Sequence, residues 1–132
     1  MSAIRFFARC ASLAVLIVPT AVVAADLATL AGSGWGVGEG DPRVVQFQPE
    51  DKIIGDSGCN RFMGPYKQES AHISIGPLGA TRKACEPEVT KQEEAFLAIL
   101  EAAAKIDVSP QVLRLLDSEG NELLALKRRH FD

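Results

Sequence analysis

A cysteine and a histidine could supply this chain with a nucleophile and its base. Cys59 is the candidate nucleophile and His72 the candidate base. Thiol catalysis needs a base held beside the sulfur and a third group that orients the base. No such third group stands out in the sequence, and an exported thiol tends to oxidise. We therefore predict no catalytic residue, and keep a Cys59-dependent hydrolase as the alternative function.

Four residues of the chain are of types that bind metal ions: Cys59, His72, Cys85 and His130. They are spread along the chain and lack the paired short spacing, such as C-x-x-C, that is typical of structural zinc sites. The sequence therefore predicts no metal site and no cofactor.

Two other patterns resemble functional sites but have structural explanations. Asp51 and Asp56 are candidate paired carboxylates, yet both flank turns, where aspartate is favoured because it hydrogen-bonds to nearby backbone. Glycine recurs at every second position of Gly32–Gly40, but no three glycines have the G-x-G-x-x-G spacing of a nucleotide-binding loop. We interpret this run as a strand with one bare face and with Trp35 as a core residue on the other.

The first 25 residues are typical of a secretory signal. Arg5 and Arg9 give a positive lead, and Cys10–Val18 is an apolar run that ends before the small residues Ala21–Ala25. Cleavage after Ala25, or one residue earlier, would leave a mature chain that begins near Asp26. The alternative is a retained anchor, but the run is shorter than the ~20 residues that span a bilayer. We expect a periplasmic or secreted protein whose mature part, residues 26–132, has no membrane span.

Composition limits the partners of the mature chain. The full chain of 132 residues has 14 basic and 17 acidic residues and three cysteines. Removal of residues 1–25 takes away Arg5, Arg9 and Cys10, which leaves 12 basic against 17 acidic residues, a net charge of −5, and two cysteines. This balance gives no basic face for nucleic acid. We interpret the one basic cluster, Lys127–Arg129, as a solvated strand end.

The rest of the chain is predicted to form short strands and one helix. We predict strands at Val44–Gln48, Lys52–Gly55, Cys59–Phe62, Pro65–Gln68, Ala71–Ile75, Ile106–Val108, Val112–Leu116 and Leu123–Leu126. Alternation in Ala71–Ile75 predicts that Ile73 and Ile75 face the core and that His72 faces out. Many strands and one helix, without βαβ alternation, indicate an α+β domain built on an antiparallel sheet.

The helix is predicted from a capping box and an apolar face. Thr90 and Glu93 have the spacing of a capping box, and an earlier start with Pro87 in the first turn is the alternative. The residues of the predicted face, at helical intervals, are Phe96, Leu97, Leu100 and Ala104.

Two motifs carry a family resemblance. Ser57–Tyr66 resembles the pattern S-G-C-N-R-F-x-G-x-Y, and Thr81–Cys85 resembles T-R-M-A-C with Lys83 in place of methionine. The two motifs occur in the expected order, and Trp35 and the predicted helix fit as well. Residues 26–132 are therefore similar to the META/HslJ-like family of bacterial envelope proteins.

The resemblance implies a fold and a setting rather than an activity. It implies a small curved or barrel-like antiparallel sheet packed with one α-helix, in an envelope protein associated with heat or antibiotic stress. We expect a non-enzymatic binding or structural module, with an envelope protein, a peptide or a small apolar ligand as partner. The candidate binding or motif residues are Asn60, Arg61, Tyr66, Thr81, Arg82 and Trp35. A structural role is the alternative, since asparagine tolerates left-handed backbone and arginine ties loops together.

Cys59 and Cys85 are expected to form a disulfide. They are the two cysteines left after signal removal, the expected compartment is oxidising, and both lie in the motifs that carry the resemblance. The alternative is a pair of reduced cysteines that pack as small apolar residues.

Overall fold

The structure is a computed structural model that describes residues 11–18 and 29–131. Most of the predicted signal peptide lies outside this part, including Arg5, Arg9 and the cleavage site before Asp26. Residues 11–18 form neither helix nor strand. Within the two described ranges, no helix combines the length and the hydropathy needed to cross a bilayer.

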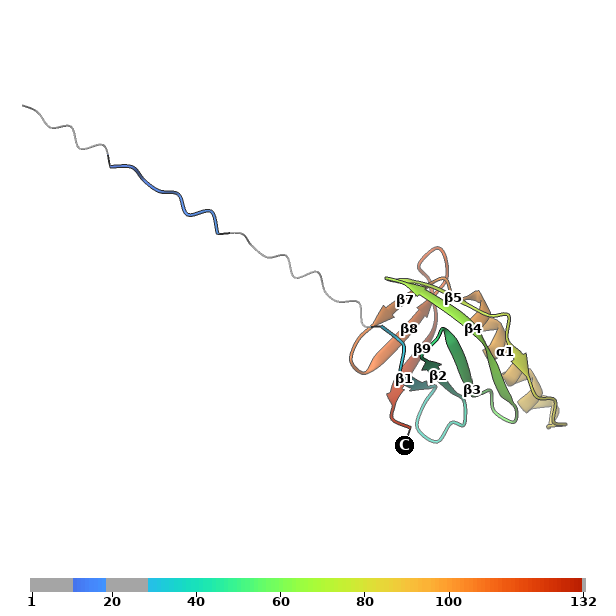
Figure 1. The fold of residues 1–132 in the computed structure, drawn as a ribbon. Coiled ribbons are helices and arrows are strands. Elements are labelled where there is room, and N and C mark those ends of the chain that lie inside the picture. The colour runs from blue at the N-terminus through green and yellow to red at the C-terminus, as the bar shows by residue number, and fades with distance from the viewer. Residues whose placement is uncertain (1–10, 19–28, 132) are drawn as a thin grey trace, which may run out of the picture.

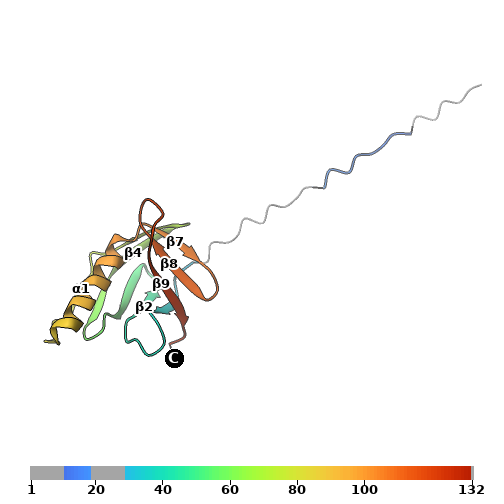
Figure 2. The same cartoon turned by 180° about the vertical axis from the view of Figure 1, so that it is seen from behind.

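The domain consists mainly of strands, with one helix in the described ranges. The elements are β1 (Ser33–Gly36), β2 (Val44–Gln48), β3 (Lys52–Asp56), β4 (Arg61–Glu69), β5 (His72–Ile75), β6 (Gly79–Ala80), α1 (Pro87–Ala102), β7 (Lys105–Val108), β8 (Val112–Leu116) and β9 (Glu122–Arg129). Figures 1 and 2 show a strongly curved sheet with α1 along one side of it, next to β4.

The strand pairings close the sheet into a ring. The order is β3-β2-β1-β9-β8-β7-β5-β4, and a further pairing of β3 with β4 completes it, while β6 lies beside β4 outside the ring. Every pairing is antiparallel. The predicted α+β class is confirmed as a mostly antiparallel sheet with a single helix in the part described.

Alternate residues of the strands fill the core. Ile73 and Ile75 are buried and His72 is exposed, as predicted from the alternation in this segment. From the helix, Phe96 and Leu100 enter the same core, and the Phe96 ring meets Phe62 edge-on at a centroid distance of 6.1 Å. The apolar face of α1 therefore packs against the inner face of the sheet.

The helix begins earlier than the capping-box prediction. Its first residue is Pro87, and the Thr90 N–H already donates to the Glu86 carbonyl oxygen at 3.0 Å. No side chain caps the helix, so Thr90 and Glu93 do not form a capping box. Proline suits a first helical position because its φ is preset and it has no N–H to satisfy. The helix also ends before Ala104, which the prediction placed on its face.

The two predicted runs Cys59–Phe62 and Pro65–Gln68 belong to one strand. β4 continues through Met63 and Gly64, where we predicted a break, and into Pro65. The Pro65 carbonyl accepts a hydrogen bond from the Gly76 N–H at 2.8 Å, so pairing continues past the proline. Gly64 permits this path because an added Cβ would lie 2.7 Å from the backbone oxygen of the neighbouring segment.

The predicted strand Gly32–Gly40 is shorter, and its glycine side is not bare. Only Ser33–Gly36 pairs with neighbours, as β1. A Cβ at Gly34 would collide with the Phe131 ring, and a Cβ at Gly36 would collide with Arg129. These glycines make room for the end of the chain.

The basic cluster Lys127–Arg129 is more than a solvated strand end. The Arg128 guanidinium lies over the Trp35 ring, with its carbon 5.0 Å from the centroid. Arg129 donates to the Gly38 carbonyl oxygen at 2.6 Å. Of the three residues, only Lys127 is exposed without such a contact, as predicted for a solvated strand end.

Candidate functional site

The first four residues of the first motif, Ser57–Asn60, form a tight loop between β3 and β4. Asp56 Oδ1 accepts a hydrogen bond from the Gly58 N–H at 2.9 Å, which confirms the turn role predicted for this aspartate. Gly58 has φ +132°, a conformation that other residues rarely adopt. The turn at this glycine directs the next two N–H groups, of Cys59 and Asn60, toward α1.

A buried carboxylate of α1 accepts these donors. Glu93 is 5% exposed, and its Oε1 accepts hydrogen bonds from the N–H groups of Cys59, at 2.7 Å, and of Asn60. The Ser57 hydroxyl lies 3.1 Å from the same oxygen. Glu93 Oε2 accepts a hydrogen bond from Asn60 Nδ2 at 2.9 Å. Both carboxylate oxygens are therefore occupied by the first motif.

The environment keeps Glu93 ionised. Burial alone would raise the pKa of this carboxyl, because a charge loses its hydration. The hydrogen bonds from Asn60, Cys59 and Ser57 outweigh burial and lower the pKa below its ordinary value of 4.5. A carboxylate held in this way is a weak proton acceptor, so the arrangement favours a structural role over general base catalysis.

Asn60 joins both motifs to the helix. While its Nδ2 donates to Glu93, its Oδ1 accepts hydrogen bonds from the Lys83 N–H at 2.7 Å and from the Thr81 hydroxyl at 3.0 Å. The Thr81 hydroxyl oxygen in turn accepts from the Arg61 N–H at 3.0 Å. The amide of Asn60 thus uses its donor and acceptor sides within the protein.

The two motif cysteines meet at the edge of this network. Their Cα atoms are 6.4 Å apart, and the sulfur atoms of Cys59 and Cys85 lie at disulfide distance. Cys59 belongs to the motif loop, and Cys85 stands two residues before the first residue of α1. The pair therefore links the loop to the entry of the helix.

A groove lies beside the network, between the segment around β6 and the first half of α1. It has a volume of 620 Å³ and apolar walls at Leu78 and Leu97. Arg82 and Lys83 add exposed cations on one side, and Glu94 adds an exposed carboxylate on the helix side. Neither cation forms an ion pair with a residue in the described ranges.

The remaining predicted site residues are divided between core and surface. Trp35 is fully buried and donates from Nε1 to the Ser33 hydroxyl at 2.8 Å. Tyr66 is buried edge-on against Phe47, and burial together with the charge of Asp51 raises the pKa of its hydroxyl. These two aromatic residues therefore serve the core rather than a binding site.

Arg61 and Arg82 are exposed, with no ion pair to a described residue, so their side chains are free to meet a partner. Asn60 and Thr81, by contrast, are held in the network. The six candidate residues therefore do not form one site.

The thiol and imidazole of the alternative hydrolase are not brought together. Cys59 precedes β4, whereas His72 pairs with Glu69 at the far end of this nine-residue strand. Nine strand residues span about 25 Å, which is far beyond hydrogen-bond reach. The described residues also contain no group of three or more His, Cys, Asp or Glu side chains placed to hold a metal ion.

Sequence reasoning missed Glu93 as the centre of the network. Its place in a capping-box pattern gave it a local explanation, which the actual helix start removes. The signal was the spacing of Glu93, Phe96 and Leu100, which puts a carboxylate on the apolar face of the helix. A buried carboxylate needs hydrogen-bond donors, and the nearby motif supplies them.

The fold and the motifs have counterparts among known proteins. Three solved structures are similar. The NMR structure of a protein from Burkholderia xenovorans has 26% identity and a TM-score of 0.65, with 77% of this chain and 85% of that chain covered. A second NMR structure has 21% identity and a TM-score of 0.58, with 74% and 90% covered. The crystal structure of a DUF4847 family protein from Bacteroides vulgatus has 14% identity and a TM-score of 0.50, with 69% and 60% covered.

The last two likenesses, at low identity, concern the fold alone. The chain matches no curated protein. A family model, however, matches residues 27–130, the stretch that contains both motifs, the buried Glu93 and all the strands. The chain belongs to the META domain family.

Proposed function

We propose that this protein is an exported envelope protein whose META domain is a non-enzymatic binding or structural module. One observation carries the proposal: buried polar groups of both motifs bond to one another and to Glu93, so the network holds the motif loop against the helix. The central carboxylate has a lowered pKa and is therefore a weak proton acceptor, and a Cys59 that is bonded to Cys85 is not a free nucleophile.

Export is supported by the charge and hydropathy of residues 1–25 and by the disulfide distance between Cys59 and Cys85. Disulfides persist in oxidising compartments and are rare in the cytosol. The test is to express the full-length chain with a carboxy-terminal tag in a bacterium and to fractionate the cells. We expect the protein in the periplasm, with a first residue of Ala25 or Asp26 by mass spectrometry. A cytosolic protein with intact residues 1–25 would contradict export.

The non-enzymatic role is tested against the Cys59-dependent hydrolase. The protein purified from the periplasm is alkylated without reduction, digested and mapped. We expect Cys59 and Cys85 in one cross-linked peptide pair, with no thiol left to act as nucleophile. Recovery of alkylated Cys59, together with esterase or peptidase activity that Cys59→Ser abolishes, would support the hydrolase instead.

A role in heat or antibiotic stress rests on the family resemblance. The test deletes the gene in its own host and measures growth at raised temperature and in the presence of envelope-directed antibiotics. We expect a growth defect that the wild-type gene restores. A deletion strain that grows like its parent under every stress would contradict this part of the proposal.

A further inference from the structure

Two large apolar side chains are exposed on the folded domain. Met63 is 60% exposed and Phe131 is 42% exposed, and no other large hydrophobic side chain in residues 29–131 is exposed. Solvent exposure of such side chains is unfavourable, and exposed apolar groups that gather on one face mark interaction sites.

Strand register places Met63 on the same face of the sheet as Gly34, over which the Phe131 ring lies. Gly34 pairs with Arg129 on one side and with Gln46 on the other, Gln46 pairs with Ile54, and Ile54 pairs with Met63. Residues directly opposite each other share a face of the sheet. The chain neighbours of this row fill the core, so the row points away from it. We call this side of β1, β2, β3, β4 and β9 the outer face.

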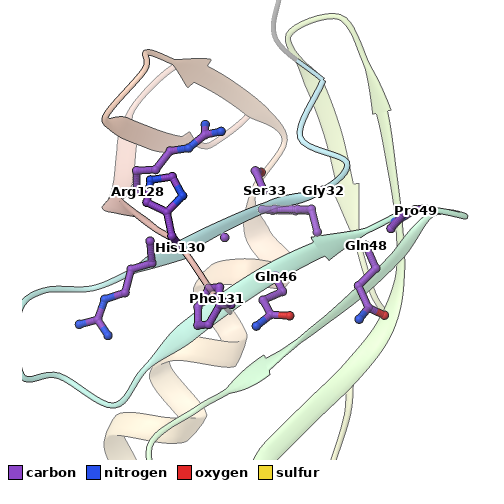
Figure 3. A pocket seen from close by; sticks show the side chains of 11 residues that line it. Gly32, Ser33, Gln46, Gln48, Pro49, Arg128, His130 and Phe131 are labelled. Carbon is purple, nitrogen blue, oxygen red and sulfur yellow. The ribbon is translucent and has the colours of Figure 1, made fainter.

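Two hollows open on the outer face and meet at Gln46. One has a volume of 320 Å³ and is lined by residues that include Gln46, Gln48 and Phe131. The other has a volume of 370 Å³, and Ile54 and Met63 contribute to its wall. In Figure 3, Gln46, Gln48 and Phe131 project to the same side of β1 and β2.

Cations surround the apolar centre of this face. A second transverse row runs through paired residues from Lys127 on β9 to Asp56 and Arg61 on β3 and β4. Arg61 and Lys127, at the two ends of this row, are exposed and form no ion pair with a described residue. Asp56 is the one carboxylate in the two rows, and it already bonds to its own loop. The two rows therefore carry three cations, Arg61, Lys127 and Arg129, against one carboxylate, although the whole chain has a net charge of −3.

We propose that the outer face binds an acidic segment of a partner polypeptide, with apolar side chains of the partner in the two hollows. This inference rests on the proposed function, for which it names the class of partner. Charge complementarity selects the acidic segment. A second copy fits poorly, because a symmetric dimer through this face would bring the cations of one copy against those of the other. Two separate hollows fit individual side chains of a polypeptide better than they fit the surface of a lipid bilayer.

The test is a selection from a displayed library of random linear peptides on protein purified after expression of the full-length chain. We expect enrichment of peptides that combine Asp or Glu with large apolar residues. A synthetic copy of the most enriched peptide is then titrated in a fluorescence anisotropy experiment. The double variant Arg61→Glu, Met63→Ser should raise its Kd by about tenfold or more.

The matched control is Lys91→Glu, which makes the same kind of charge reversal on the exposed side of α1 and should leave the Kd unchanged. If the double variant does not fold, Lys127→Glu with Phe131→Ser tests the other hollow. Enrichment without acidic residues, no enrichment, or equal binding to the variants would overturn the proposal. Binding of phosphatidylglycerol vesicles, or self-association, that the same outer-face variants abolish would also overturn the proposal. Export is tested separately, by identifying the first residue of the mature protein. Failure of this proposal can therefore be distinguished from failure of export.

Discussion

At the motif loop a charged side chain is buried and bonded, whereas on the outer face two large apolar side chains are exposed. Glu93 accepts hydrogen bonds from the backbone and side chains of the first motif. On the outer face, Met63 on β4 and Phe131, just beyond β9, are both exposed. Both arrangements cost free energy in isolation, but only the first is compensated within the described protein. The difference divides the first motif: its inward-facing groups hold the fold through Glu93, whereas Arg61 and Met63 of the same motif face outward on the surface that we propose for a partner.

The largest effect on stability is expected from removal of the disulfide between Cys59 and Cys85. Cys59 and Cys85 are 26 residues apart, for which the chain-entropy model gives about 3.5 kcal/mol of stabilisation. Cys85→Ser should therefore lower the free energy of unfolding by about 3.5 kcal/mol in urea titrations. Reductant should lower the wild-type midpoint and leave the variant unchanged. Equal midpoints for the wild type with and without reductant would show that the cysteines are not bonded.

A somewhat smaller loss is expected when the buried acceptor is removed. Glu93→Ala leaves the N–H groups of Cys59 and Asn60 without their partner, which should cost on the order of 3 kcal/mol. Glu94→Ala, at the exposed neighbour, is the control and should change stability by less than about 0.5 kcal/mol. Equal effects of the two substitutions in denaturant titration would contradict the network.

Acid should destabilise the folded protein by protonating Glu93. Because the pKa of Glu93 is lower in the folded protein than its ordinary value of 4.5, the folded state binds its proton less tightly than the unfolded chain. The stabilisation is present above the unfolded pKa and is lost as pH falls through the folded value. The free energy of unfolding should therefore fall below about pH 4.5 more steeply in the wild type than in Glu93→Gln. Parallel pH profiles would contradict an ionised Glu93.

The smallest effect on stability is expected at the outer face. Met63→Ser removes an exposed side chain and should change the free energy of unfolding by no more than about 0.5 kcal/mol. Thermal unfolding followed by circular dichroism measures this. A loss of more than about 2 kcal/mol would mean that Met63 supports the fold, and would remove the contrast between the two regions.

Local patterns in the sequence predicted most strands but not the contacts between distant segments. Ile73 and Ile75 alternate with polar residues, and this period of two identified their buried face correctly. The path of β4 through Gly64 and Pro65 depends on what packs beside it, which no local rule contains. For the same reason the pairing of β1 with β9, which joins the two ends of the domain, follows from the folded register alone.

The candidate site was predicted in its residues but not in its chemistry. Asn60 and Thr81 were identified from the motifs, yet their link to each other and to Glu93 spans more than twenty residues of chain. The capping-box pattern at Thr90 gave the glutamate a plausible local partner, and the proline start of the helix made that partner unnecessary. Local rules thus predicted a capping contact within the helix for Glu93, whose hydrogen bonds in fact join it to a distant segment of the chain.

The most direct test of the account is a double-mutant cycle between the motif and the helix. The free energies of unfolding are measured in urea for the wild type, Asn60→Ala, Glu93→Ala and the double variant. Because Asn60→Ala removes the Nδ2 group that donates to Glu93 Oε2 and keeps the backbone N–H, the cycle isolates the side-chain bond, for which we predict a coupling energy of at least about 1 kcal/mol. The double variant should then be more stable than the sum of the single effects allows. Additive effects within about 0.3 kcal/mol would contradict the claim that the family motifs hold the fold through this carboxylate.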